Sequence, residues 1–192
     1  TLTPTSPLKT GTVTITLTTS EKLRSVPVFS FTPYGKDLIV ISLTSQDNII
    51  WKGTMTITET TGDGTATFNF SGTDLAGNIG TEITSGKIFI IDTQPPQIPQ
   101  NFEATPKDTI INLSWTANIE TDVVGYNVYR DGANKPLNAI LITNIAYSDT
   151  GLTNGRTYRY TITAIDITGN ESGHSASVTA SSVAGPEWEI VQ

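Results

Sequence analysis

Short runs in which apolar and polar residues alternate recur along this entire sequence. In the run GTVTITLTT, which begins at Gly11, the residues Val13, Ile15 and Leu17 share one face and threonines occupy the other. A period of two is typical of a β-strand that buries one face. The runs are bounded by Gly, Pro, Asp, Asn or Ser, which form turns, and none has helical spacing. The sequence therefore predicts an all-β chain of antiparallel β-sandwiches in tandem.

A proline-rich joint separates two sets of these runs. The first set has further runs at 26–31, 38–44, 53–60, 64–72 and 86–92, and the second set has runs at 109–117, 123–132, 139–149, 156–166 and 175–184. Between them lies DTQPPQIPQ, whose prolines Pro95, Pro96 and Pro99 cannot donate ladder hydrogen bonds and keep the segment short and stiff. We expect one sandwich over residues 1–93, a linker over 94–99, a second sandwich over 100–185, and a tail or the start of another segment over 186–192.

The composition suits exposed sheet surfaces and argues against several classes of partner. Threonine occurs 34 times, and Ser and Thr together make up about a quarter of the chain; a β-branched hydroxyl suits the outer face of a strand. The net charge of -7 argues against nucleic acids and anionic membranes, which are held by clusters of Lys and Arg. There is no cysteine, so each half must rely on its own apolar core. No apolar run approaches the roughly 18 residues of a membrane span.

Three segments of the second half, NLSWTA, DVVGYNVYRDG and GLTNGRTYRYTITAIDITGNES, closely resemble the fibronectin type III fold. The resemblance covers nearly all of residues 99–184. It implies that Trp115 is the buried aromatic residue of the second strand. It also implies that Leu152 and Tyr158 form a tyrosine corner, in which the phenol reaches the backbone of the preceding loop.

Three segments of the first half are GTVTITLTTSEKL, GDGTATFNFSGTDLAGNIG and FIIDTQPP. They resemble the bacterial Ig-like domains of large secreted and cell-surface proteins. The resemblance implies a prokaryotic, extracellular, multidomain parent. Since the first residue is Thr1, we expect the chain to be part of a longer protein, with any export signal outside it.

One short motif occurs twice, as TDLAGNIG from Thr73 and as IDITGNES from Ile165. Each copy follows the expected penultimate strand of its sandwich. In one interpretation the Asp side chain opens a hairpin turn, and Gly and Asn adopt the left-handed backbone that the turn needs. In the other, Asp74 with Asn78, or Asp166 with Asn170 and Glu171, contributes to a weak calcium site. We favour the turn, because calcium usually takes six to eight oxygen ligands and these loops offer few carboxylates.

No arrangement of catalytic residues is evident. His174 is the only histidine, and it is expected on or beside the final strand of a sandwich without an obvious cleft, which disfavours a Ser/His/Asp site. Asp166 with Glu171 lacks the cleft and the apolar pocket that a glycosidase pair needs. We therefore predict no enzyme activity, no catalytic, metal or cofactor residue, and no cofactor.

Two further motifs are given no function. The order of residues in RDG, Arg130 to Gly132, differs from the integrin-binding motif, and we interpret it as a turn. Glycosylation sequons begin at Asn69, Asn112 and Asn170, but twelve asparagines in so Ser- and Thr-rich a chain would produce about three by chance.

Aromatic residues are the remaining candidates for a ligand site, because exposed rings can stack on sugars. We assign Trp115, Tyr158 and either Tyr126 or Tyr129 mainly to the second core. Trp51, at the start of a strand, has two open interpretations, packing at a sheet edge or a role at the surface. Trp188 lies in the tail and is expected either to dock on the second domain or to begin the next. No planar row of rings can be recognised, so the ligand residues stay unknown.

These observations favour a non-catalytic spacer or presentation module of an exported bacterial protein, located outside the cell or at its surface. Its partners would be the neighbouring domains of the same protein, and we expect a monomer that neither inserts into membranes nor binds nucleic acid. The alternative is an adhesion module that binds a polysaccharide or a cell-surface protein.

The spacer hypothesis predicts that the two domains stand end to end as a fairly rigid rod. In such sandwiches the chain enters and leaves at opposite poles, the linker has little slack, and Ile98 and Phe102 are expected to seat the joint on the second core. Small-angle scattering should give a radius of gyration on the order of 24 Å, against roughly 16 Å for one compact globule of this length. A value near the compact figure would remove the main support for a spacer.

Overall fold

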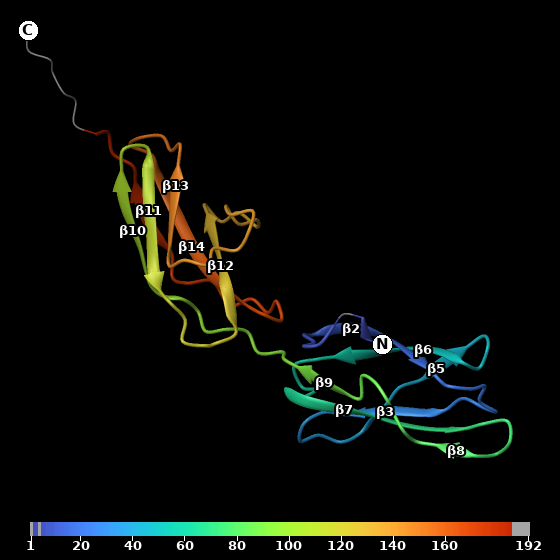
Figure 1. Ribbon diagram of the computed structural model, residues 1–192. Helices are drawn as coiled ribbons and strands as arrows, with labels where there is room; N and C mark the ends of the chain where they lie inside the picture. The colour runs from blue at the N-terminus through green and yellow to red at the C-terminus, as the bar shows by residue number, and fades with distance from the viewer. Residues whose placement is uncertain (1, 4, 186–192) are drawn as a thin grey trace, which may run out of the picture. The chain divides into compact units, whose positions relative to one another are not determined.

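A computed structural model describes residues 2–3 and 5–185 of the chain. These residues form β-strands and loops, which confirms the prediction of an all-β fold. They belong to two compact units, Thr1–Gln94 and Pro95–Gln192 (Figure 1). Each unit has its own apolar core. Within the described part of the chain, no helix is long and apolar enough to cross a membrane.

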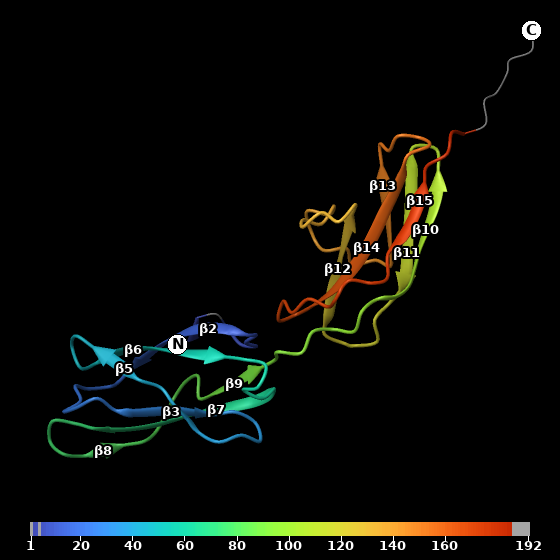
Figure 2. The same ribbon diagram turned by 180° about the vertical axis from the view of Figure 1, so that it is seen from behind.

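The N-terminal unit is a sandwich of two sheets (Figures 1 and 2). One sheet has the strand order β1-β2-β6-β5. In the other, β4, β3 and β7 are neighbours in that order, and both β8 and β9 pair with β7. The strands are β1 (Leu2–Thr3), β2 (Gly11–Thr18), β3 (Val28–Thr32), β4 (Ile39–Val40), β5 (Leu43–Ser45), β6 (Ile50–Ile57), β7 (Gly64–Thr73), β8 (Ile79–Gly80) and β9 (Ile88–Ile91).

Aromatic rings dominate the core between these sheets. The Phe68 ring stacks on Phe29, with centroids 5.0 Å apart, and on Phe89, with centroids 4.6 Å apart. Trp51 belongs to the same core and is only 2% exposed. The hypothesis of a surface role for Trp51 is therefore wrong. Its position opposite Leu17 in the β2–β6 ladder directs the indole into the sandwich, which the start of a strand does not reveal.

The expected strand over residues 38–44 is divided between the two sheets. Its first part, β4, pairs with β3, whereas its second part, β5, pairs with β6 of the opposite sheet. Ile41 lies between them, buried, with its amide bonded to the Phe29 carbonyl. The continuous apolar run thus contains a crossing between sheets, at which Ile41 and Leu43 enter the core while Ile39 and Val40 stay exposed.

The C-terminal unit is a second sandwich, with antiparallel sheets of order β10-β11-β13 and β12-β14-β15. Trp115 lies in its core, as expected, in edge contact with Tyr126 at 5.2 Å between centroids. Phe102 packs beside Trp115, whereas Ile98 stays 40% exposed. The strands are β10 (Gln100–Lys107), β11 (Ile110–Thr116), β12 (Val123–Arg130), β13 (Ala146–Thr150), β14 (Thr157–Asp166) and β15 (Val178–Ser181).

Two elements of this unit differ from the sequence-based expectation. Strand β10 was not anticipated, because it carries Pro106 and few apolar residues; it is stabilised by pairing with β11 along one edge. The run at 139–149 forms a strand only from Ala146, and its earlier part contributes a single bridge between Ile142 and Tyr126. Apolar composition alone does not indicate which part of such a run finds a partner strand.

The predicted tyrosine corner is confirmed. Tyr158 is 4% exposed, and its hydroxyl oxygen accepts a hydrogen bond of 3.0 Å from the Thr153 amide. Leu152 is buried beside it in the core, and its amide bonds to the Thr109 carbonyl. The corner therefore ties the loop before β14 to the body of the sandwich.

A buried polar cluster joins the two sheets of this unit. The Asp149 carboxylate on β13 accepts hydrogen bonds of 2.8 Å from the Arg130 guanidinium on β12 and from the Tyr160 hydroxyl on β14. Burial, together with the bond to Asp149, raises the pKa of Tyr160, so the phenol stays protonated. Because a buried charge is costly without partners, these bonds stabilise the Asp149 carboxylate and link the two sheets.

The tyrosine corner generates a stability prediction. Tyr158→Phe leaves the Thr153 amide without its partner, so the free energy of unfolding should fall by about 1 to 2 kcal/mol in chemical denaturation. Tyr147→Phe is the matched control, because its hydroxyl makes no hydrogen bond within the described residues. An unchanged midpoint for Tyr158→Phe would show that the corner contributes nothing.

Candidate functional site

The two copies of the repeated motif form the same hairpin turn. In the first, the Asp74 carboxylate accepts hydrogen bonds from the backbone amide and the side-chain amide of Asn78, at 2.8 and 2.7 Å. In the second, Asp166 receives the corresponding bonds from Asn170, at 2.8 and 2.9 Å, and a further bond from the Thr168 amide. Each Asp amide in turn donates to the carbonyl of its Asn.

The expected left-handed backbone conformation is confirmed for the glycines of these turns but not for the asparagines. The glycines do adopt a left-handed backbone, with φ of 97° at Gly77 and 83° at Gly169. The asparagines do not; their role is to donate hydrogen bonds to the carboxylate. Sequence reasoning missed this role because Asn serves both purposes in turns.

This geometry supports the turn interpretation over calcium binding. Hydrogen bonds from the Asn78 side chain and backbone lower the pKa of Asp74, so the charge is stabilised by the turn itself. A calcium ion would have to displace these donors. That the loops bind no calcium remains a prediction.

The residues of the RDG motif and of the glycosylation sequons make contacts within the fold. Arg130 belongs to the buried cluster with Asp149, while Asp131 and Gly132 form a turn with φ of 55° and 75°. The Asn69 and Asn112 side chains bond to neighbouring strands, through Thr32 and Ser148. Asn170 is the buried donor of the second turn.

The structure resolves which of the aromatic candidates belong to the second core. Tyr126 and Tyr158 lie in the core with Trp115, but Tyr129 points to the opposite, outer face of the β12–β14 sheet. Trp188 lies outside the described residues. Tyr129 is therefore the aromatic residue that lines a surface site in this unit.

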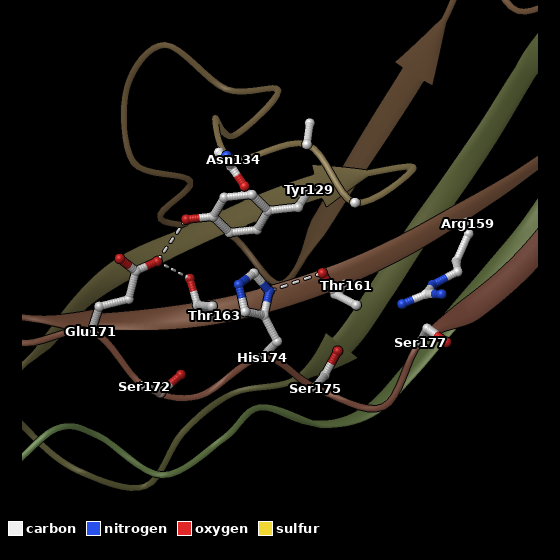
Figure 3. A pocket seen from close by; sticks show the side chains of 12 residues that line it. Tyr129, Asn134, Arg159, Thr161, Thr163, Glu171, Ser172, His174, Ser175 and Ser177 are labelled. Atoms are coloured by element: carbon white, nitrogen blue, oxygen red, sulfur yellow. Dashed lines mark hydrogen bonds between the residues drawn. The ribbon is translucent and has the colours of Figure 1, made fainter.

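That site is a groove of about 700 Å³ across the outer face of β12 and β14 (Figure 3). Its floor contains Tyr129 and the outward threonines of β14, Thr161 and Thr163. One wall is the turn at 132–134 after β12. The other wall is the segment 171–177, which we call the strap. The expectation that this sandwich has no cleft near His174 is therefore wrong: the strap turns a flat sheet face into a groove.

The strap follows β14 without forming a regular strand. The amides of Ser172 and Ser175 donate to the carbonyls of Ala164 and Ile162, each at 2.9 Å. The same two serine hydroxyls accept hydrogen bonds from the Ala164 and Ile162 amides, at 2.9 and 3.1 Å. Side-chain oxygens thus replace backbone carbonyls as partners of β14, and they hold the strap in place.

This anchoring positions two functional groups over the floor. The Glu171 carboxylate accepts hydrogen bonds from Tyr129, at 2.7 Å, and from Thr163, at 2.5 Å. Nδ1 of His174 shares a hydrogen bond of 2.9 Å with the Thr161 hydroxyl, and its ring meets Tyr129 edge to face at 4.6 Å between centroids. Figure 3 shows these side chains gathered in one place.

The groove does not assemble a nucleophile and a base. The hydroxyls of Ser172 and Ser175 accept from backbone amides and donate to the carbonyls of Gly173 and Ala176, so neither is oriented toward His174. Nδ1 of His174 is bonded to a threonine and not to a carboxylate, unlike the base of a Ser/His/Asp triad.

Acid–base chemistry of the glycosidase type is not supported either. Burial raises the pKa of Glu171, but hydrogen bonds from Thr163 and Tyr129 outweigh this effect and hold the pKa below its ordinary value. A general acid needs the opposite shift. Asp166 is bound within its turn, so the two carboxylates have separate structural roles.

No protein-family model matches the chain. Sequence relatives share about half of it. It is 41% identical over 97 residues to exoglucanase B of Cellulomonas fimi, which covers 50% of this chain and 8% of the relative. It is 36% identical over 96 residues to an alpha-amylase of Niallia circulans, a match that covers 49% of this chain and 7% of the relative. It is 38% identical over 105 residues to chitinase A1 of the same organism, a match that covers 54% of this chain and 14% of the relative. The chain thus spans a small part of each relative.

Solved structures match nearly the whole chain. The fibronectin(III)-like modules of Clostridium thermocellum CbhA superpose with a TM-score of 0.53 and 11% identity, over 96% of this chain and 94% of that one. The C-terminal unit has the fibronectin type III fold. A crystal structure of titin domains gives a TM-score of 0.57 at 16% identity, over 92% of this chain and 60% of the other. At these identities the likeness concerns the fold alone.

The fibronectin type III assignment agrees with the residues from which it was predicted. Trp115 is in the core, and Tyr158 forms its corner with Thr153. The Ig-like assignment of the N-terminal unit rests on its sandwich of two sheets, and it remains a proposal.

The turn chemistry predicts the effects of calcium and of removing the carboxylates. Asp166→Ala leaves buried amides unpaired and should lower the free energy of unfolding by about 2 kcal/mol or more. Asp74→Ala should lower the melting temperature of its unit. The exposed Asp37→Ala is the control for the change of charge.

Millimolar calcium should not raise the melting temperature of the unmodified chain; a rise of many degrees that a chelator reverses would establish a calcium site.

Proposed function

We propose that this chain is a non-catalytic pair of sandwich modules that spaces or presents neighbouring domains of a larger protein. The observation that carries the proposal is the nature of the relatives. An exoglucanase, an alpha-amylase and a chitinase differ in activity, yet each contains a stretch of about a hundred residues similar to half of this chain. A stretch that is common to proteins of different activities does not account for any one of those activities.

The chemistry of the described residues supports the same conclusion. The carboxylates of the repeated motif are engaged in their turns, and Glu171 is held in its charged form by Tyr129 and Thr163. His174 contacts a threonine and a tyrosine ring. These groups shape the surface, and their arrangement does not activate water or a hydroxyl.

The proposal includes the organisation and location of the parent protein. The N-terminal unit is taken as an Ig-like domain over residues 1–93, joined through the linker at 94–99 to the fibronectin type III domain at 100–185. The bacterial relatives support a bacterial parent that acts outside the cell or at its surface, with neighbouring domains as partners of a monomeric chain. The scattering measurement described above tests the spacing itself.

The absence of catalysis is tested with the chain alone. Incubation with cellulose, starch or chitin should release no more reducing sugar than buffer does, because no carboxyl group of the groove has the raised pKa of a general acid. Sugar release that disappears in Glu171→Gln would overturn the non-catalytic assignment. Release that persists in this variant would be attributed to a contaminating hydrolase and checked by repurification.

A further inference from the structure

The groove of the fibronectin type III unit holds polar groups that can make further hydrogen bonds beyond those within the fold. Arg159 is exposed at one end, and its side chain makes no hydrogen bond or ion pair within the described residues (Figure 3). His174 has a second ring nitrogen without a hydrogen bond in the same part of the chain. Glu171 retains its negative charge at the other end. An exposed guanidinium, an imidazole and a carboxylate therefore face one groove.

These groups are held in position before any ligand arrives. Ser172 and Ser175 anchor the strap, Tyr129 and Thr163 orient Glu171, and Thr161 orients His174. Preorganisation lowers the entropic cost of binding, because few side chains must be ordered by the ligand. Arg159 and Thr163 are four residues apart on β14, so the groove extends for roughly 13 Å along the strand. That length suits a short oligomeric ligand.

The position of the groove disfavours a peptide. An extended peptide is commonly bound by adding a strand to a free sheet edge, with pockets for apolar side chains. Here the floor is a sheet face, and β14 is paired on both sides, with β12 and with β15. The lining is mostly polar, with small side chains in the turn wall at Gly132 and Ala133.

The charges disfavour an anionic polymer. Glu171 would repel it within the groove, and the net charge of -7 would repel it from the whole chain. A neutral ligand rich in hydroxyl groups has neither difficulty. Each hydroxyl both donates and accepts, so it can donate to a carboxylate and accept from a guanidinium, and such charge-assisted bonds are the stronger kind.

We propose that this groove binds an uncharged oligosaccharide. Glu171 accepts hydrogen bonds from sugar hydroxyls, Arg159 donates to them at the other end, and the exposed ring of His174, packed against the buried Tyr129, provides the apolar contact between. This inference goes beyond the spacer role, which requires no ligand, so each can fail without the other.

Titration followed by nuclear magnetic resonance tests the proposal. The isotope-labelled chain is titrated separately with cellohexaose, maltohexaose and chitohexaose. At least one should cause saturable shifts of backbone amides at 129–134, 159–163 and 171–177. Arg159→Gln and Glu171→Gln should each raise the dissociation constant roughly tenfold, the effect of one lost charge-assisted hydrogen bond. The Glu171→Gln variant keeps a side-chain oxygen that can accept hydrogen bonds from Tyr129 and Thr163, so the groove is expected to keep its shape.

Lys107→Gln is the matched control for Arg159→Gln, because it also removes a positive charge, but from β10 in the opposite sheet, outside the groove lining. It should bind like the unmodified chain. Absence of saturable shifts with all three sugars would overturn the proposal, as would binding that both groove variants retain. Shifts of the same amides with heparin or with an extended polar peptide, and not with the sugars, would assign the groove to a different class of ligand.

Discussion

The structure depends on burying one face of most long strands between two sheets; the edge strand β10, which has no buried residue, is the exception. There is no cysteine to cross-link either unit, so apolar burial has to offset the loss of chain entropy on folding. The alternation seen at Val13 and Ile15 serves this need directly, since both point into the first core. A shift of register by one residue would expose such residues and bury threonines, which is why the pairing is unambiguous.

Polar groups within this framework must still find partners wherever the ladder is interrupted. Side chains supply them at several such points: Asp74 and Asp166 in the two turns, Tyr158 in its corner, and Ser172 in the strap. The same rule therefore explains both the shared turns of the two sandwiches and the unusual wall of the groove. The groove is a consequence of a strap that leaves the regular ladder yet keeps its backbone groups satisfied.

The functional picture has two independent parts. A spacer needs stable units with little chemistry of their own, and the turns and cores meet that requirement. The groove adds a surface on which Glu171 and Arg159 stay available to a ligand. A module that spaces domains and also contacts a saccharide would combine both properties, but the spacing does not depend on the contact.

Periodicity and turn residues were sufficient to predict most of the strands and the two sandwiches, because these features depend on local alternation and short spacings, which a single sequence displays. The place of Trp115 and the corner at Tyr158 were predicted from the resemblance to the fibronectin type III fold. The burial of Trp51, the crossing of the chain between sheets at Ile41 and the outward direction of Tyr129 could not be predicted. Alternation indicates which residues share a face, but only the packing of the sheets decides which face is covered. The groove belongs to this second group, because it requires β12, β14 and the strap to meet through contacts between residues far apart in the sequence.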